Sequence, residues 1–263
     1  MGDDLNIEPH FYRHANGPIW RRCATKVFYG ATAWALFATA TLQAAPQAAH
    51  VAHKAPPTKA AVSISDPVKT YGTKGAPITL ELFTDYECPI CRSFYENTLR
   101  SLINDYVAAG KVYIVHHDYP LSMHPYSGQA ARWADAAATV GEFGSAEGAL
   151  YDNQDKWAAN GNIAPFLAQA MPHSDFEKVA AIMKDCTTPA PQVTMSNVDP
   201  LAKSGHSCPV DPSIAKDIEV GYKANVNATP TYIIYHNGQK IAQGSSYVSW
   251  PIFRQFLDSI LSQ

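Results

Sequence analysis

The sequence is short of charge and of repeated elements. Only 16% of its 263 residues are charged, and the formal net charge at pH 7 is -3. A nucleic-acid-binding protein needs a basic face, and this composition supplies none, so that class is excluded. No internal repeat is present, which speaks against a repeat architecture. Hydrophobic residues make up 46% of the chain, so it can bury a sizeable core.

Long apolar runs are also missing. The uncharged stretch "VFYGATAWALFATATL" at residues 27–42 is shorter than the about 20 apolar residues of a typical membrane-spanning helix. It follows Arg21, Arg22 and Lys26 and precedes the small-residue segment "QAAPQAAH". A basic start, a short apolar centre and a small-residue exit are typical of an export signal. We therefore predict an export signal at residues 1–45 and a periplasmic or otherwise exported protein. An uncleaved membrane anchor is the alternative.

The pattern downstream predicts a linker and then one folded domain. Residues 46–63 are rich in Ala and Pro and are expected to form a flexible tether. Residues 64–263 are expected to fold. Hydrophobic patterning predicts these elements in order: strand 76–84, helix 91–107, strand 111–116, a helical block at 126–185, helix 211–225, a hairpin turning at Asn237-Gly238, and a final helix. This order indicates an α/β fold with a partly parallel sheet and a helical insertion at about 122–210.

The segment "FTDYECPICRSFYE" carries the chemistry. Cys88 and Cys91 fall where a predicted strand gives way to a predicted helix. Backbone N–H groups at a helix start favour negative charge, and the thiolate is the reactive form of cysteine. Pro89 costs no hydrogen bond in the first turn, and a spacing of three places both sulfurs on one helix face. The pair is therefore predicted to cycle between dithiol and disulfide, with Cys88 attacking and Cys91 resolving.

Three other roles for this pair are conceivable: a zinc site, a structural disulfide and a metallochaperone site. A zinc site built on Cys-x-x-Cys normally needs two more ligands of similar spacing, and the sequence has no second Cys-x-x-Cys. A structural disulfide across one helical turn would constrain almost nothing. The remaining rival is a thioredoxin-like metallochaperone that holds copper or zinc through Cys88 and Cys91, since thiolates suit copper. We predict no metal site in the catalytic role and no dissociable cofactor.

A second motif, "NATPTYII", places Thr229 and Pro230 between a helix and a β-rich run. Together with "GAPITLELFTDYECPIC", "YIVHHDYPL", "GQAARWADAAA", "LYDNQDKW" and "NGQKIAQG", it resembles the thioredoxin superfamily, and most of all the exported thiol–disulfide oxidoreductases of the DsbA type. The resemblance implies a thioredoxin-like fold whose inserted helical domain is a lid. It also implies client proteins that are exported and contain cysteine, and a membrane protein that resets the redox pair.

The resemblance assigns roles residue by residue. Cys88 takes the place of the nucleophile and Cys91 that of the second cysteine. Pro230 takes the place of a cis-proline beside the substrate groove. Thr229, which precedes it, takes the place of a residue that influences substrate binding and redox tuning. No nucleic acid is implied as a partner.

Two departures from the family pattern bear on the direction of electron flow. Many relatives carry a buried acidic residue six positions before the first cysteine, where this chain has Leu82; Glu81 is one step away and is expected on the opposite face of the strand. The strongest oxidants carry His in the middle of the pair, where this chain has Ile90. We therefore expect a less depressed pKa for Cys88 and a less oxidising couple. Oxidase, isomerase and reductase directions stay open.

Two further cysteines and two adjacent histidines lie outside the Cys88–Cys91 segment. Cys186 and Cys208 are predicted to form a structural disulfide around a proline-rich excursion, and a second redox relay with Cys91 is the alternative. His116 and His117 are expected on opposite faces of their strand, one packed and one solvated, with no catalytic role.

Overall fold

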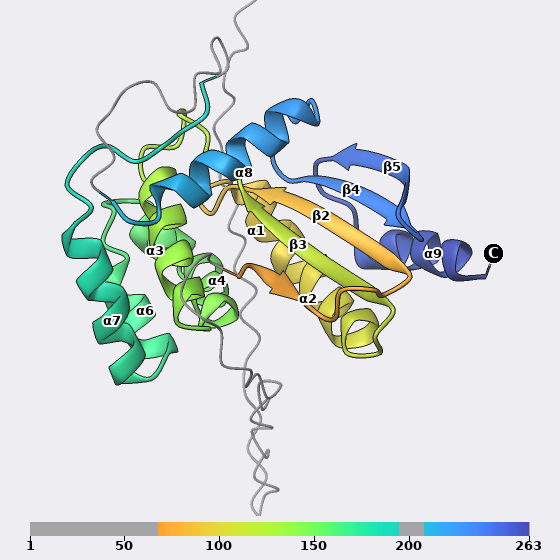
Figure 1. Ribbon diagram of the computed structural model, residues 1–263, viewed down its shortest axis with the longest axis horizontal. Coiled ribbons are helices and arrows are strands. Elements are labelled where there is room, and N and C mark those ends of the chain that lie inside the picture. The colour runs from red at the N-terminus through yellow and green to blue at the C-terminus, as the bar shows by residue number, and fades with distance from the viewer. Residues whose placement is uncertain (1–67, 195–207, 263) are drawn as a thin grey trace, which may run out of the picture. The chain divides into compact units, whose positions relative to one another are not determined.

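A five-stranded mixed sheet lies at the centre of the described chain (Figure 1). The computed structural model describes residues 68–194 and 208–262. The strands lie in the order β1-β3-β2-β4-β5. Only β2 and β3 pair in parallel, and the other three pairings are antiparallel. The strands are β1 (Thr70–Tyr71), β2 (Ile78–Thr84), β3 (Val112–Asp118), β4 (Thr231–His236) and β5 (Gln239–Ser245).

Several sequence predictions fall outside the described residues. These are the export signal or anchor at 1–45, the linker at 46–63, the first residues of the folded domain, and part of the excursion, at 195–207. Within 68–194 and 208–262, no helix combines the length and apolar character that crossing a bilayer requires.

The helix that follows the cysteines is less regular than the sequence predicts. It runs as α1 (Pro89–Phe94), the π-helical η1 (Tyr95–Leu99), α2 (Arg100–Leu102) and the π-helical η2 (Ile103–Val107). Phe94 and Leu99 are both 1% exposed although they are five residues apart. A π turn has the wider spacing that keeps such a pair on one face, whereas an α-helix favours spacings of three and four.

The sheet is buried on both faces because its strands alternate between two apolar clusters. On β2, Leu80 and Leu82 join the larger cluster with Phe94 and Leu99, whereas Phe83 joins a smaller cluster with Ile214 and Ile218 of α8 (Asp211–Lys223). In Figure 1, α8 lies in front of β2 and β3, and α1 and α2 lie behind them. The final helix α9 (Trp250–Leu261) packs on η1 and α2. Both faces of β2 therefore help to fix the loop at its carboxyl end.

The helical insertion follows β3 and precedes α8. Its helices are α3 (Ser127–Thr139), α4 (Phe143–Asp152), α5 (Gln154–Trp157), α6 (Ala164–Ala170) and α7 (His173–Lys184). Alanines of α3 pack closely: Ala130, Ala134 and Ala137 are each fully buried. Trp157 is also fully buried, and its indole N–H donates to the Leu150 carbonyl at 2.6 Å.

A buried ionic cluster joins the sheet, the insertion and α8. Lys69, just before β1, binds Asp118 on β3, Asp135 on α3 at 2.6 Å and Asp217 on α8 at 2.5 Å. The oxygen Oδ1 of Asp217 lies 2.8 Å from Nδ1 of His117. Removing one partner from such a cluster leaves an uncompensated buried charge, so the three elements are held in one arrangement.

The prediction for the histidines is partly wrong. His116 and His117 do engage different elements: His116 packs on Phe143 of α4, and His117 pairs with Asp217 of α8. Neither is solvated, however, since their exposed fractions are 2% and 8%. The sequence does not reveal that helices cover this strand on both faces at its end.

Candidate active site

Cys88 occupies the N-cap position of α1, four residues after β2 ends. Its backbone is extended (φ -72°, ψ 120°), its N–H donates to the Asp85 carbonyl at 3.1 Å, and its carbonyl accepts from the Arg92 N–H at 3.1 Å. Pro89 follows in the first turn, where its missing N–H costs nothing. The strand end and the helix start therefore fix the Cys88 sulfur beside the backbone N–H groups of the first turn.

Cys88 and Cys91 are not joined by a disulfide, and their pKa values are shifted in opposite directions. The pKa of Cys88 is lowered to about 6, mainly by a hydrogen bond from the Cys91 side chain and also by the backbone N–H groups of Cys91 and Ile90, while burial opposes this. The Cys91 thiol is 1% exposed, and burial, followed by the interaction with Cys88, raises its pKa well above the usual value. Near neutral pH, Cys88 is therefore a thiolate and Cys91 a thiol.

The segment before β4 lies against the Cys88 sulfur. The Thr229–Pro230 peptide bond is cis, and the Cys88 sulfur, when protonated, donates a hydrogen bond to the Thr229 carbonyl at 3.5 Å. Both residues are buried, and within the described residues the Thr229 hydroxyl has no hydrogen-bond partner. The structure therefore brings together Cys88, Cys91, Thr229 and Pro230, which lie about 140 residues apart in the sequence.

Asp85 is a buried residue of this site that the sequence analysis does not identify. Its carboxylate accepts hydrogen bonds from the Glu87 N–H at 2.8 Å, the Leu121 N–H at 2.9 Å and the Ser127 hydroxyl at 2.7 Å, and it lies 2.6 Å from Nδ1 of His124. It therefore anchors the loop after β3 to the cysteine loop. An Asp directly after a buried strand is a weak signal, because its partners other than the Glu87 N–H are 36 to 42 residues away.

The acidic position that the family pattern places on β2 is apolar here. Leu82 is fully buried in the same apolar cluster as both cysteines. Glu81 does point to the other face, where it accepts a hydrogen bond from Tyr235 at 3.2 Å. The expectation for Glu81 is therefore confirmed, and no strand carboxylate reaches Cys91 from these two positions.

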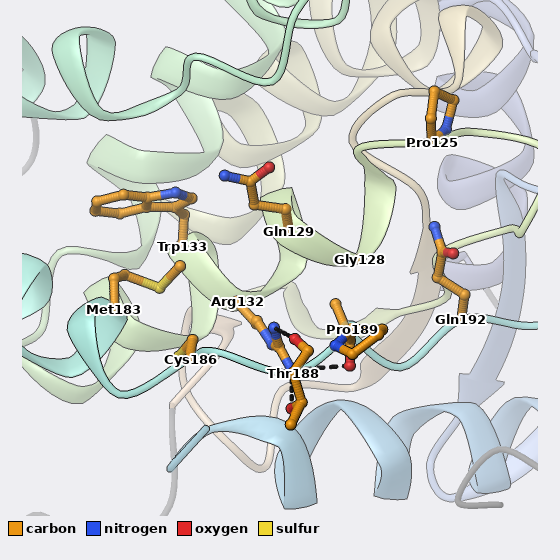
Figure 2. Close-up of a pocket in the computed structure, with 11 residues that line it drawn as sticks. Pro125, Gly128, Gln129, Arg132, Trp133, Met183, Cys186, Thr188, Pro189 and Gln192 are labelled. Atoms are coloured by element: carbon orange, nitrogen blue, oxygen red, sulfur yellow. Dashed lines mark hydrogen bonds between the residues drawn. The ribbon is translucent and has the colours of Figure 1, made fainter. Parts of the chain in front are cut away.

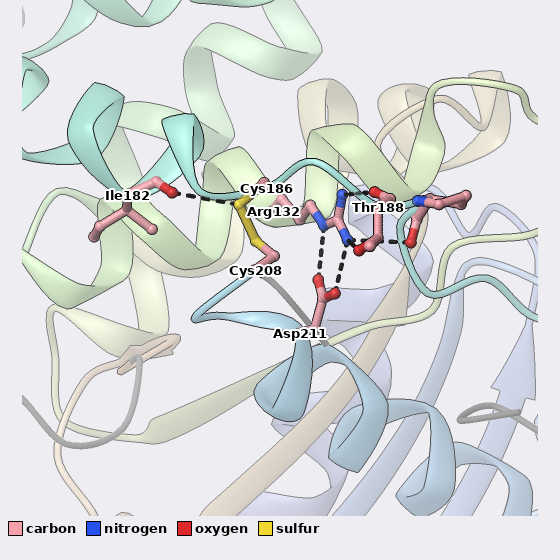
Figure 3. The surroundings of a disulfide bond; sticks show 7 residues. Arg132, Ile182, Cys186, Thr188, Cys208 and Asp211 are labelled. Atoms are coloured by element: carbon pink, nitrogen blue, oxygen red, sulfur yellow. Dashed lines mark hydrogen bonds and ion pairs between the residues drawn. A yellow bond between two sulfur atoms is a disulfide. The ribbon is translucent and has the colours of Figure 1, made fainter. Parts of the chain in front are cut away.

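Cys186 and Cys208 are joined by a disulfide that links the end of α7 to the start of α8 (Figure 3). Arg132 of α3 lies beside it and donates two hydrogen bonds of 2.7 Å to Asp211. The same guanidinium donates to the carbonyls of Thr188 at 2.6 Å and Pro189 at 3.1 Å. Cys186 and Cys208 therefore belong to a polar junction within the helical part of the chain.

A cavity of 430 Å³ lies against this junction rather than at the Cys88–Cys91 pair (Figure 2). Trp133 and Met183 line one end of it, and Gln192 and Pro125 line the other. None of Cys88, Cys91, Thr229 and Pro230 lines it. The cavity is therefore a feature of the helical insertion and not of the candidate site.

The fold and the paired thiols define a thioredoxin-like redox protein, and the comparisons with known proteins agree. A family model described as Thioredoxin matches residues 65–253. The chain therefore belongs to the thioredoxin family. The predicted resemblance and the predicted fold class, a thioredoxin-like α/β fold with a helical insertion, are confirmed.

Two solved structures share this fold at low sequence identity. One is alpha-DsbA1 of Wolbachia pipientis, with 17% identity, a TM-score of 0.55 and coverage of 74% of this chain and 90% of that chain. The other is DsbA2 of Pseudomonas aeruginosa, with 20% identity, a TM-score of 0.51 and coverage of 76% and 97%. Both are therefore similar to this chain in fold, including the helical insertion.

Two curated proteins match in sequence. The first is Na(+)/H(+) antiporter NhaA 3 of Salinispora tropica, 35% identical over 85 residues, which are 32% of this chain but only 13% of the antiporter. The second is described as "Probable disulfide bond formation protein D" of Bacillus cereus, 23% identical over 175 residues, or 65% of this chain and 70% of that protein.

Proposed function

We propose that the protein is a thiol–disulfide oxidoreductase that acts on exported, cysteine-containing proteins through the Cys88-Pro-Ile-Cys91 pair. The observation that carries the proposal is that the two cysteines have pKa values shifted in opposite directions. Cys88 is a thiolate near neutral pH, with a pKa of about 6, and Cys91 is held as a thiol behind it. Thiolates attack disulfides, so this arrangement supplies one nucleophile and one resolving group. Membership of the thioredoxin family supports the same activity.

The reaction proceeds through a mixed disulfide. In the reductive direction, the Cys88 thiolate attacks one sulfur of a client disulfide, and the other client sulfur leaves as a thiolate. The Cys91 thiolate then attacks Cys88, the bond between Cys88 and the client breaks, and the second client sulfur leaves. The client disulfide has gained two electrons and two protons, and the enzyme has become the Cys88–Cys91 disulfide. The oxidative direction is the reverse.

Thr229 and Pro230 support the client backbone in this proposal. The Thr229 carbonyl already lies 3.5 Å from the Cys88 sulfur, so a client strand bound there would present its own sulfur to Cys88. Ile90, which is 43% exposed, offers an apolar contact at the tip of the pair. Replacing Thr229 should therefore change client binding more than it changes the reaction with small disulfides.

The cellular setting follows from the N-terminal sequence. We infer an export signal at residues 1–45, or an uncleaved anchor there, a linker at 46–63 and a catalytic domain at 64–263 with its helical insertion at about 122–210. A membrane redox partner would reset the pair after each turnover. Sequencing the N-terminus of the protein from an exporting host tests the signal, since a start near Ala45 is expected and an intact Met1 would leave only the anchor.

Trapping tests the central proposal. Cys91→Ser should accumulate a mixed disulfide between Cys88 and client proteins, visible on non-reducing gels and absent from Cys88→Ser. The wild-type protein should also reduce insulin in the presence of a thiol reductant. A stoichiometric copper or zinc content after anaerobic purification, together with no insulin reduction, would instead establish the metallochaperone role.

The reduction potential decides the direction of electron flow. The pKa of about 6 for Cys88 lies between the values of about 3.5 and about 7 that mark strongly oxidising and reducing pairs. A less stabilised thiolate makes the reduced form less favoured, so we expect a couple less oxidising than the strongest members of the family. Equilibration with glutathione measures it, and a potential at the strongly oxidising end would contradict this expectation.

A further inference from the structure

One buried side chain binds two backbone carbonyls of the cysteine loop, the four residues 85–88 that link β2 to α1. The side-chain amide nitrogen of Gln154 donates hydrogen bonds to the Tyr86 carbonyl at 2.6 Å and to the Cys88 carbonyl at 3.1 Å. All three residues are buried, with exposed fractions of 4%, 1% and 6% for Gln154, Tyr86 and Cys88. Because the bonds are shielded from water, loss of the donor would leave both carbonyls with a desolvation penalty.

Gln154 belongs to the helical insertion and is the first residue of α5. At the other end of α5, Trp157 is fully buried and donates its indole N–H to the Leu150 carbonyl, which fixes α5 on α4. On the exposed side, Asp155 forms an ion pair of 2.6 Å with Arg92 of α1. The amide of Gln154 is therefore presented to the cysteine loop by a helix that is held on both sides.

Other contacts between the insertion and the cysteine loop go to side chains of the loop. The Asp85 carboxylate accepts a hydrogen bond from the Ser127 hydroxyl at 2.7 Å. The Glu87 carboxylate accepts one from the Tyr126 N–H at 2.6 Å. Gln154 differs from these residues because it binds the backbone of the nucleophilic cysteine itself.

The position of the Cys88 backbone determines where its sulfur lies. The Cys88 carbonyl accepts hydrogen bonds from the Arg92 N–H and from the Gln154 amide, both at 3.1 Å, so the residue is fixed from the helix and from the insertion. The sulfur lies beside the backbone N–H groups of Ile90 and Cys91. Cys91 must also approach it in line with the client sulfur. Because a displacement of about 1 Å can slow a reaction by about a hundredfold, this alignment depends on a fixed backbone.

We propose that Gln154 is a positioning residue for disulfide exchange, whose amide holds the Cys88 backbone so that the Cys88 sulfur stays beside the helix N–H groups and in line with Cys91; this rests on the exchange function proposed above. Gln154 acts through the carbonyls of Tyr86 and Cys88. The helical insertion therefore contributes to the reaction of the cysteine pair through one neutral side chain.

A two-step reaction with 5,5′-dithiobis(2-nitrobenzoate) separates attack from resolution. The full-length protein carries Cys23→Ser, so that Cys88 and Cys91, both reduced, are the reacting thiols. The Cys88 thiolate attacks the reagent, one thionitrobenzoate leaves, and the other stays bonded to Cys88. Cys91 then gives its proton to the buffer and bonds to Cys88, and the second thionitrobenzoate leaves as a thiolate.

Gln154→Met removes both N–H donors and keeps the length of the side chain. The second release should be slower by about tenfold, because Cys91 is no longer aligned with the Cys88 sulfur. The first release at pH 7 should stay within about threefold. Iodoacetamide labelling of Cys88, followed by mass spectrometry, should show its inflection about one unit above the wild-type value of about 6. A side chain that only stabilises the fold would lower Tm without moving the inflection.

Two control variants separate the amide from the helix that carries it. Gln169→Met makes the same chemical change at an exposed position of α6, and Asp155→Asn breaks the exposed ion pair with Arg92 but keeps the amide. Both should leave the two rates within about twofold and the inflection unmoved. If Asp155→Asn slowed the second release as much as Gln154→Met does, the docking of α5 and not the amide would be responsible, which overturns the proposal.

The remaining outcomes distinguish the two proposals. A second release at the wild-type rate with an unmoved inflection, in a folded Gln154→Met protein, would overturn the role of Gln154 and leave the exchange function intact. A protein with the native Gln154 that releases no thionitrobenzoate would overturn the exchange function itself.

A smaller side chain keeps the test available if Gln154→Met does not fold. Gln154→Ala leaves room for a water molecule that can donate to the carbonyls of Tyr86 and Cys88, so the cost to folding is smaller. A water molecule does not tie the cysteine loop to α5, so the second release should still be slower by about threefold or more. The wild-type rate of the second release in the folded Ala variant would overturn the proposal.

Discussion

The described chain has two cysteine pairs, Cys88–Cys91 (the inner pair) and Cys186–Cys208 (the outer pair), and they differ in spacing, surroundings and bonding state. Cys88 and Cys91 are one helical turn apart at a helix start, and their pKa values move in opposite directions. Cys186 and Cys208 are 22 residues apart, link two helices, and are already joined. The first pair constrains almost no chain when it closes, whereas the second closes a long loop. In the proposed function, disulfide exchange and cross-linking of the chain are therefore divided between two sites.

The surroundings make the same distinction. The Cys88–Cys91 pair lies beside helix N–H groups and the Thr229 side chain, which lower the pKa of Cys88. The outer pair lies beside the Arg132–Asp211 ion pair, which ties together the same segments that the disulfide joins. The comparison indicates that the backbone context of a cysteine, and not its presence alone, determines whether its thiol ionises readily or is joined in a disulfide.

The largest difference between the pairs should appear in activity. Cys88→Ser replaces the thiolate by a hydroxyl that does not ionise near neutral pH, so disulfide exchange should fall below detection. Cys186→Ser should keep exchange within about twofold, because surface or distant substitutions leave the reacting groups in place. Insulin reduction by the two purified variants measures this. Loss of turnover in Cys186→Ser with unchanged melting would instead make the outer pair a redox relay.

The second-largest expected effect is the loss of stability when the Arg132–Asp211 ion pair is broken. Arg132→Met leaves Asp211 buried without its cation, and breaking a buried pair in this way costs about 3–5 kcal/mol of unfolding free energy. Arg92→Met removes an exposed pair with Glu96 and Asp155 and should cost about 1 kcal/mol or less. Urea denaturation of both variants compares them. Equal losses would show that the Arg132 junction is not a stabilising feature.

The sulfur bridge itself should contribute somewhat less. Closing the loop between Cys186 and Cys208 stabilises the fold by about 3 kcal/mol in the chain-entropy model. For a chain of this size, each kcal/mol shifts Tm by about 2–4 °C, so Cys186→Ser should lower Tm by about 6–12 °C. Differential scanning calorimetry of the oxidised proteins gives the value. Because Arg132 and the disulfide tie the same segments, the double variant should lose less than the sum of the single losses.

The sequence predicts what local patterns can encode. The strands at 78–84 and 112–118, the hairpin at Asn237-Gly238 and the helices of the insertion follow from apolar periodicity and turn residues. The placement of the Cys88–Cys91 pair at a helix start follows from the position of Cys88 between a predicted strand and a predicted helix. The two-residue strand β1 has no such pattern, because Thr70 and Tyr71 are too few to show alternation.

Long-range contacts explain what the sequence does not reveal. Asp85, Glu147 and Lys69 act through partners that lie tens of residues away, and each sits in a segment that looks ordinary by itself. Glu147 occupies a helix whose pattern permits an exposed carboxylate, yet β1 and β3 cover it. Only the topology shows that a buried acid exists at all on this side of the sheet.

The smallest expected effect tests how finely the inner pair is tuned. Ile90→His places an imidazole beside Cys88, and a positive charge or an N–H donor near a thiol favours its thiolate. Iodoacetamide labelling of wild-type Cys88 should rise with pH through about 6 and then level, because only the thiolate reacts. The variant should show the same curve displaced by about one unit to lower pH, which corresponds to about 1.4 kcal/mol. Since Ile90 is 43% exposed, the change should leave packing and the outer disulfide intact. An undisplaced curve would mean that the Cys91 hydrogen bond and the backbone N–H groups alone set the pKa of Cys88. Residue 90 would then contribute nothing to the difference in ionisation between Cys88 and the disulfide-bonded cysteines.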